Sequence, residues 1–157
     1  MRSILPTSGN TSTASGKKVF VGISGGVDSG VSAALLKRQG YDVTGVFIRI
    51  AISGYPCPAA ADRLEAMRVA AHLRIPFIEI DLSKEYEEEI FRPAIESFAH
   101  GRTPNPDTLC NEKIKFGHFY SFARARGAEY VATGHYAQTQ GGNLYKGTDE
   151  NKDQSYF

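Results

Sequence analysis

A run of glycine, serine and aspartate, Ser24-Gly25-Gly26-Val27-Asp28-Ser29, lies between an apolar segment and a helical pattern. Glycines can adopt positive φ and turn successive backbone N–H groups toward an anion, and the N-terminus of a following helix adds unpaired donors. The run lacks the lysine of a Walker A loop. Because the Asp28 carboxylate would repel a polyphosphate unless a cation lay between them, the run predicts a phosphate site with Mg²⁺. The alternative is a glycine-rich turn capped by Asp or Ser.

A second segment with reactive groups, Pro104-Asn105-Pro106-Asp107, precedes Cys110. Prolines restrict the backbone, so this segment can present amide and carboxylate groups to a flipped-out base at a small ordering cost. We expect Cys110 to lie just ahead of a helix that carries Lys113 and Lys115, a setting that favours the thiolate. A packed small residue is the alternative interpretation of this cysteine.

The composition is that of one globular domain, with 157 residues, 41% of them hydrophobic and 22% charged. No apolar run approaches the roughly 20 residues of a membrane span, and the first residues lack the order of a secretory signal, so we expect a cytoplasmic protein without a membrane partner. The two cysteines, Cys57 and Cys110, are too few for a disulfide scaffold and lack the spacing of a zinc site. The net charge is +1, but residues 100–126 are basic, which indicates either phosphate contacts or a solvated helix face.

The phosphate-loop and cysteine segments must be positioned by the strands and helices around them. From Lys17 onward, apolar strand patterns alternate with helical patterns. Strand patterns cover 18–23, 42–50 and 76–82, and helical patterns cover 31–40 and 62–73. Strands with little alternation are buried on both faces, so we predict an α/β fold with a doubly wound, mainly parallel sheet and helices on both faces. Residues 1–16 are predicted to form a flexible tail ahead of the folded domain, residues 17–157.

The remaining segments are expected to form shorter elements. A helical stretch at 83–101 is interrupted at Pro93, and the two prolines of 103–107 predict a shaped loop that is neither helix nor strand. A helix at 111–126 and a strand at 128–136 should follow. Gly141-Gly142 then predicts a hairpin.

The run at 24–29 resembles the PP-loop of the N-type ATP pyrophosphatases, Rossmann-like enzymes that cleave ATP between the α and β phosphates. Further segments resemble one family that carries this loop, the tRNA-specific 2-thiouridylases. They are, in order, 101–111 with Ile114-Lys115-Phe116, then 132–136 and 152–157. The resemblance extends over nearly all of Lys17 to Phe157, and four motifs in the same order are more specific than one.

This resemblance implies an ATP-dependent sulfurtransferase that thiolates the wobble uridine of tRNA in two steps. The uracil C2 oxygen attacks the α-phosphorus of ATP, and persulfide sulfur then displaces AMP. By the same resemblance Cys110 and Asp107 match catalytic positions, and Cys110 matches the cysteine that attacks the persulfide. The matching positions imply contacts with ATP, the target base and the tRNA: for ATP, Gly22, Ile23, Ser24, Gly25, Gly26, Val27, Asp28, Ser29, Ile48 and Gly134; for the base, Asn105, Pro106 and Asp107; for the tRNA, Lys152, Asp153 and Gln154.

Two partners and two absent domains follow from the same resemblance. The family uses tRNA and a persulfide donor, either a cysteine desulfurase or a sulfur-relay protein. Its persulfide-bearing cysteine, linking domain and β-barrel domain lie further downstream than Phe157, so we expect this domain to be incomplete at its C-terminus.

Several alternatives stay open. The chain could be another PP-loop adenylating enzyme with a small-molecule substrate, or a nucleotide-binding fragment without turnover. Cys57 matches no catalytic cysteine of the family and is expected to be incidental, whereas Ile48 and His135 could simply be packed residues. The sequence departs from the family pattern at two places. One is the loop around Cys57, and the other is Gly30.

Overall fold

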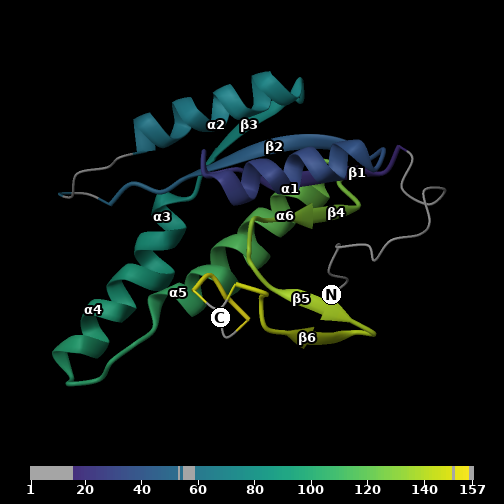
Figure 1. The fold of residues 1–157 in the computed structure, drawn as a ribbon. Helices are drawn as coiled ribbons and strands as arrows, with labels where there is room; N and C mark the ends of the chain where they lie inside the picture. Colours follow the sequence, from purple (N-terminus) through teal and green to yellow (C-terminus); the bar gives the residue numbers. More distant parts are fainter. Residues whose placement is uncertain (1–15, 53, 55–58, 150, 156–157) are drawn as a thin grey trace.

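The computed structural model describes residues 16–52, 54, 59–149 and 151–155, and four parallel strands form its main sheet (Figure 1). They are β1 (Lys18–Gly22), β2 (Asp42–Arg49), β3 (Phe77–Asp81) and β4 (Tyr130–Ala132). The strand order is β3-β2-β1-β4, so the chain first builds outward from β1 and then returns to its other side. The predicted parallel α/β fold is confirmed, and its topological switch lies between β1 and β4.

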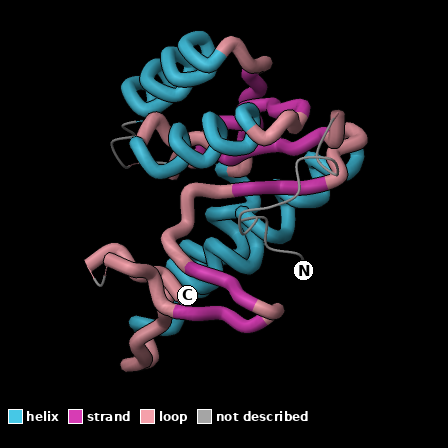
Figure 2. Tube along the Cα trace, turned by 45° about the vertical axis from the view of Figure 1, so that its right-hand side comes forward, coloured by secondary structure: helices cyan, strands magenta, loops and turns pink. Residues whose placement is uncertain are grey.

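Helices cover both faces of this sheet, as Figures 1 and 2 show. On one face lie α1 (Val27–Arg38) and α2 (Ala59–Leu73). The other helical segments are α3 (Ser83–Tyr86), η1 (Glu87–Phe91), α4 (Arg92–Ala99), α5 (Pro106–Leu109), η2 (Cys110–His118) and α6 (Phe119–Ala125). Of these, η1, η2 and α6 contribute buried side chains to the opposite face.

Alternating strand side chains divide the core into two layers. Val19 and Val21 pack toward α1 and α2, whereas Phe20 packs toward α6, where Phe119 is fully buried. Each such side chain contributes about 1.5–3 kcal/mol when it is removed from water. Both layers meet the same central strand, β1, and this fixes the position of the loop that follows it.

The helix around Cys110 begins earlier than the sequence predicted. Pro106 is the first residue of α5, which continues without a break into η2 and α6. The side-chain oxygen of Asn105 caps this helix by accepting hydrogen bonds from the backbone N–H groups of Asp107 (3.1 Å) and Thr108 (3.3 Å). The expectation that 103–107 contains no helix was therefore wrong at Pro106 and Asp107, because a proline at the first helical position loses no hydrogen bond.

The smaller predictions have mixed outcomes. The hairpin is confirmed, with β5 (Gln138–Gln140) antiparallel to β6 (Asn143–Tyr145) around the two glycines. The predicted strand at 128–136 is shorter than expected. The expected tail, apart from Gly16, and the Cys57 loop, apart from Gly54, lie outside the described residues. Among the residues described, no helix combines the length and apolar character that crossing a membrane would take.

Candidate functional site

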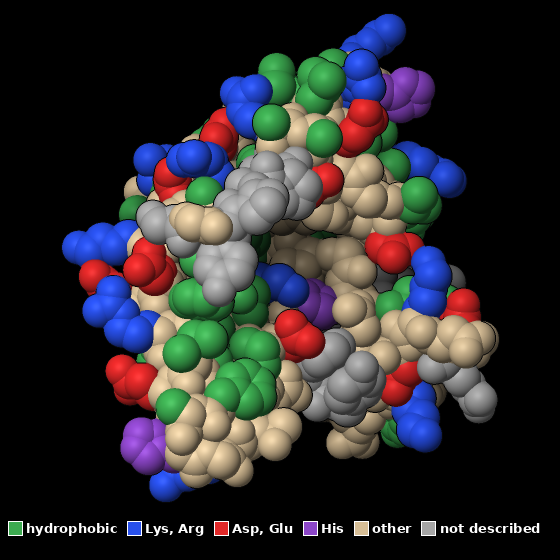
Figure 3. Space-filling view, turned by 90° about the vertical axis from the view of Figure 1, so that its left-hand side faces the viewer, with side chains coloured by type: hydrophobic (Ala, Val, Ile, Leu, Met, Phe, Trp, Pro, Cys, Tyr) green, Lys and Arg blue, Asp and Glu red, His purple; other side chains and the backbone are tan. Residues whose placement is uncertain are grey.

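A cavity of about 470 Å³ lies at the carboxyl ends of β1, β2 and β4, next to the topological switch. Ligands of open α/β sheets bind at this place. Figure 3 shows the hollow from the side, with basic and histidine side chains in view at its wall. The structure brings most of the predicted site residues to this cavity: Gly22, Ile23, Ser24, Gly26, Asp28, Ser29, Ile48, Cys110, Gly134 and Gln154.

The loop after β1 is held by its own serines. Ser29 is buried, donates its hydroxyl to the carbonyl of Gly26 (3.1 Å) and accepts from the N–H of Ser24 (3.2 Å). Gly26 is the N-cap residue of α1 and has no side-chain cap. The first N–H groups of α1 lie at the cavity end of the sheet. Because the N-cap residue supplies no side-chain acceptor for them, they can donate to an anion there.

Two glycines of the site allow close backbone approach. Gly25 has a φ of +81°, and a Cβ there would lie 3.0 Å from the carbonyl oxygen of Asp62 in α2. A Cβ at Gly134 would lie 2.6 Å from the backbone nitrogen of Ser29. The segment after β4 is thus in contact with the first turn of α1, and the cavity forms between them.

Asp28 lies in the first turn of α1 with its side chain about half exposed. Its Oδ1 is 3.5 Å from Nζ of Lys152, a residue of the C-terminal segment. Within the described part of the chain, no cluster of three or more His, Cys, Asp or Glu side chains could hold a metal by itself. Mg²⁺ is commonly held by one or two carboxylates together with phosphates, and a single carboxylate at the mouth of a phosphate site fits that pattern.

The C-terminal segment closes one side of the cavity. The backbone N–H of Gln154 donates to the carbonyl of Tyr136, and its side-chain oxygen accepts from the N–H of Tyr136, both at 3.0 Å. Asp153 accepts from the N–H groups of Gly147 (2.8 Å) and Ser155 (3.2 Å). These bonds, that from Gly147 foremost, lower the pKa of Asp153, so its carboxylate stabilises the loop.

Cys110 is half-buried in the cavity wall, and its thiol is less acidic than the sequence predicted. Burial raises the pKa of the Cys110 thiol; the Lys115 ammonium acts in the opposite direction, and the Asp107 carboxylate adds to the rise. The prediction that the surroundings of Cys110 favour its thiolate was therefore wrong. Because the helix begins at Pro106, Cys110 lies a full turn from the helix N-terminus. The helix dipole therefore contributes little to stabilising a thiolate at Cys110.

A hydrogen-bonded group beside Cys110 was missed by sequence reasoning. Nε2 of His135 lies 3.3 Å from Nζ of Lys115 and 3.0 Å from Oδ1 of Asn111, and its Nδ1 lies 2.6 Å from Oγ1 of Thr133. Burial, and then the Lys115 charge, lower the pKa of His135 to about 4, so the ring is neutral near pH 7. Lys115, Thr133 and His135 all line the cavity, as does Asp62. Only the fold shows this, because 20 residues separate Lys115 from His135.

Some predicted site residues lie outside the cavity wall. Val27 is 78% exposed, and Asn105 caps the helix that carries Cys110. The other predicted residues that do not line the cavity are Gly25, Pro106, Asp107, Lys152 and Asp153. Asn105, Pro106 and Asp107 instead form the start of one helix ahead of Cys110, and their side chains are available to a larger ligand.

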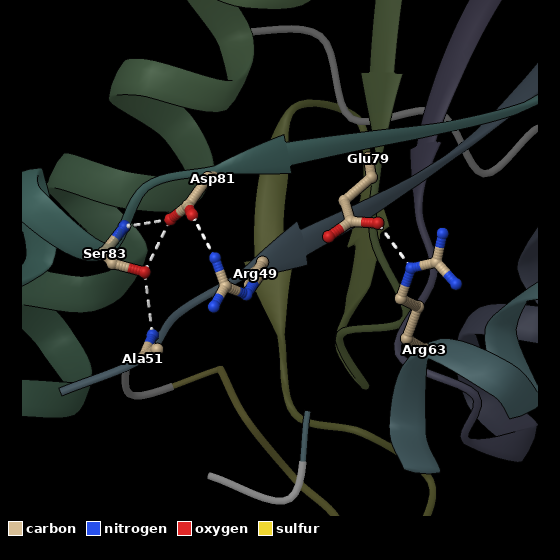
Figure 4. Close-up of polar contacts among 6 residues, drawn as sticks. All are labelled: Arg49, Ala51, Arg63, Glu79, Asp81 and Ser83. Carbon is tan, nitrogen blue, oxygen red and sulfur yellow. Dashed lines mark hydrogen bonds and ion pairs between the residues drawn. The ribbon is translucent and has the colours of Figure 1, made fainter. Parts of the chain in front are cut away.

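The wall formed by β2 is fixed by polar contacts at the strand ends (Figure 4). Asp81 at the end of β3 bonds Arg49 at the end of β2 and accepts from Ser83, whose hydroxyl oxygen in turn accepts from the N–H of Ala51 (2.8 Å). The bonds from Ser83, ahead of the Arg49 charge, hold the pKa of Asp81 below its usual value. These contacts fix the chain on both sides of Ile50, which lines the cavity with Ile48.

Known structures share this fold. A U34-tRNA thiolase, NcsA from Methanococcus maripaludis, superimposes with a TM-score of 0.59 at 22% identity, covering 82% of this chain and 41% of that chain. A glutamine-dependent NAD⁺ synthetase from Acinetobacter baumannii has a TM-score of 0.51 at 17% identity, covering 76% of this chain and 22% of the other. At these identities the likeness shows the fold alone.

Curated relatives are much more similar in sequence. Two proteins named tRNA-specific 2-thiouridylase MnmA are 46% identical over 154 residues, from Mycoplasmopsis pulmonis, and 50% identical over 149 residues, from Francisella tularensis. These matches cover 89% and 90% of this chain, and the chain spans 42% of the length of each relative. A family model described as the tRNA methyl transferase HUP domain matches residues 17–157. The chain therefore belongs to the tRNA methyl transferase HUP domain family.

Proposed function

We propose that this chain is the ATP-using part of a tRNA 2-thiouridylase, which activates the wobble uridine for replacement of its C2 oxygen by sulfur. The observation that carries the proposal is the convergence of the phosphate loop and Cys110 on one cavity. A nucleotide site and a thiol in one cavity suit a reaction that adenylates an oxygen and then delivers sulfur to the same carbon. The names of the two MnmA relatives support the same substrate.

ATP would bind with its phosphates at the N-terminus of α1 and its adenine near β2. Ser24, Gly26 and Ser29 surround the phosphate end, where backbone N–H groups can donate to anionic oxygens. Ile48 and Gly134 line the remaining wall. Asp28 would hold Mg²⁺ together with the phosphates, which removes the repulsion between its carboxylate and the polyphosphate.

In the first step the uracil C2 oxygen forms a bond to the α-phosphorus, and pyrophosphate leaves. Adenylation converts a poor leaving oxygen into a good one. The terminal sulfur of a cysteine persulfide then bonds to C2 and AMP departs, which leaves the base joined to that cysteine through a disulfide. The Cys110 thiolate attacks the cysteine sulfur of this disulfide, so that a disulfide with Cys110 forms and the thiolated base leaves. The persulfide sulfur would come from a donor protein, a cysteine desulfurase or a sulfur relay, and the cytoplasm is the location we propose for the enzyme.

The tRNA would approach from the helix that begins at Asn105 and from the C-terminal segment. Asn105 and Asp107 lie close to Cys110 along one helix, and Lys152 and Gln154 lie beside the phosphate loop. The base would enter between them.

Pyrophosphate release from ATP and Mg²⁺ tests this function. We expect release to rise when unmodified tRNA with a wobble uridine is added, and not when small amides or carboxylates are added. Stimulation by a small acceptor would instead favour another adenylating enzyme of the same fold. Binding of ATP without release under any condition would mean that the chain acts only as a nucleotide-binding fragment.

A further inference from the structure

The helix that carries Cys110 is a π-helix between Cys110 and His118, and this changes which side chains share a face. Cys110 and Lys115 are five residues apart, yet both line the cavity. An α-helix would place such residues about 140° apart around its axis. In a π-helix the hydrogen bonds run from i to i+5 and the turn is wider, so residues five apart lie much closer to one face. The N–H of Phe119 still donates to the carbonyl of Ile114, in the same i to i+5 pattern.

Gly117 is adapted to this wide turn. A Cβ at Gly117 would lie 3.1 Å from the carbonyl oxygen of Glu112, which is five residues earlier in the same turn. That distance is shorter than ordinary van der Waals contact with a backbone oxygen. Any larger residue would therefore press on the turn that aligns Lys115 with Cys110.

Lys115 is also held from outside the helix. Its Nζ lies 3.3 Å from Nε2 of His135, which accepts from it in the tautomer whose Nδ1–H donates to Oγ1 of Thr133 (2.6 Å). Because His135 is neutral, it adds no competing positive charge. Within the described part of the chain, Asp107 on the same helix and Tyr86 from α3 also interact electrostatically with Cys110, and neither is a cation near pH 7.

We propose that Lys115 is a positioning residue that stabilises the thiolate of Cys110, and that the π-turn with Gly117 places it there. This role rests on the proposed use of the Cys110 thiolate to release sulfur. Burial raises the pKa of Cys110 and so disfavours the thiolate. Among the described residues that line the cavity, Lys115 carries the positive charge that acts in the opposite direction.

The test is the pH dependence of alkylation of Cys110 by iodoacetamide, measured in a Cys57→Ser background so that one thiol reports. Lys115→Met should raise the pH at which the alkylation rate is half-maximal, and should slow alkylation about three- to tenfold at a pH below that midpoint. The reason is that the positive charge that stabilises the thiolate is removed. Lys115→Arg should stay near the parent. Lys113→Met is the matched control, since Lys113 carries the same charge on the same helix but pairs with Glu112 at the surface (3.1 Å), and it should change little.

Gly117→Ala gives an independent measurement of the turn. It should raise the Cys110 midpoint in the presence of Lys115 and add nothing once Lys115 is methionine. Equal midpoints for Lys115→Met and its parent, or equal effects of Lys115→Met and Lys113→Met, would overturn the proposal. Should Gly117→Ala fail to fold, the lysine variants still decide. Alkylation requires neither ATP nor tRNA, so its outcome is separate from that of the proposed function.

Discussion

Nζ of Lys152 lies 3.5 Å from Oδ1 of Asp28, although 124 residues separate the two along the chain. Both side chains are about half exposed, so this ion pair contributes about 0–1 kcal/mol to stability and can exchange readily. The pair connects the C-terminal segment to the phosphate loop.

Asp28→Asn should lower ATP turnover by about 100-fold or more, because the amide cannot replace the carboxylate that we propose as the ligand of Mg²⁺. The melting temperature should change little, since only a weak surface pair is lost. The measurement is pyrophosphate release over a range of Mg²⁺ concentrations. Asp42→Asn, an exposed acid at the start of β2, is the control with the same change in charge and should retain turnover. Undiminished turnover in Asp28→Asn would refute the assigned role.

Cys110→Ser should separate the two chemical steps. Adenylation does not use the thiol, so tRNA-stimulated AMP formation should stay within about threefold of the parent, whereas formation of 2-thiouridine should stop in any longer form of the protein that catalyses it. Mass spectrometry of the digested tRNA measures the second product. Cys57→Ser should alter neither step. If Cys110→Ser lost both steps equally, Cys110 would have to act before sulfur transfer.

Gly134→Ala should weaken ATP binding about tenfold or more and destabilise the fold by about 1–3 kcal/mol, because the added Cβ would lie 2.6 Å from the nitrogen of Ser29. Urea unfolding and equilibrium ATP binding measure the two effects. Gly26→Ala is the steric control: its Cβ would meet only the Ser24 hydroxyl, at 3.4 Å, and its stability should stay near that of the parent. Equal stability of the two variants would contradict the close approach.

His135 should make stability depend on pH below neutrality. Its pKa is lowered from 6.5 to about 4 in the folded chain, so the unfolded chain binds more protons between these values. The stability it supports is complete above about pH 6.5 and is lost as the pH falls toward 4. Because the ring is partly exposed, the loss should be about 1–2 kcal/mol. Urea unfolding at about pH 6.5 and at about pH 4 should show a smaller change in the free energy of unfolding in His135→Gln than in the parent. His72→Gln, at an exposed position of α2, should behave as the parent does.

The sequence predicted the elements that carry local signals. The buried strand patterns predicted the parallel sheet, and the glycines and serines at 24–29 predicted the turn between β1 and α1. The sequence pattern did not predict the helix start at Pro106, because proline disfavours the interior of a helix although it is favoured in the first turn. The Asn105 cap was a local signal that could have corrected this.

Other features of the site depend on tertiary contacts that no local pattern contains. The Lys152–Asp28 pair and the His135–Lys115 contact join distant segments. The direction of the Cys110 pKa was predicted wrongly because nearby lysines are visible in the sequence, whereas burial is not. The π-helical turn also has no clear sequence signal other than a glycine in an otherwise helical segment.

The most direct test of the account is transfer of the α-phosphorus of ATP to tRNA. With α-³²P-labelled ATP and Mg²⁺, in the absence of any sulfur source, the chain should label unmodified tRNA that has a wobble uridine, and should not label the same tRNA with cytidine at that position. Pyrophosphate release without labelled tRNA, or equal labelling of both tRNAs, would contradict adenylation of the wobble uridine as the reaction of this domain.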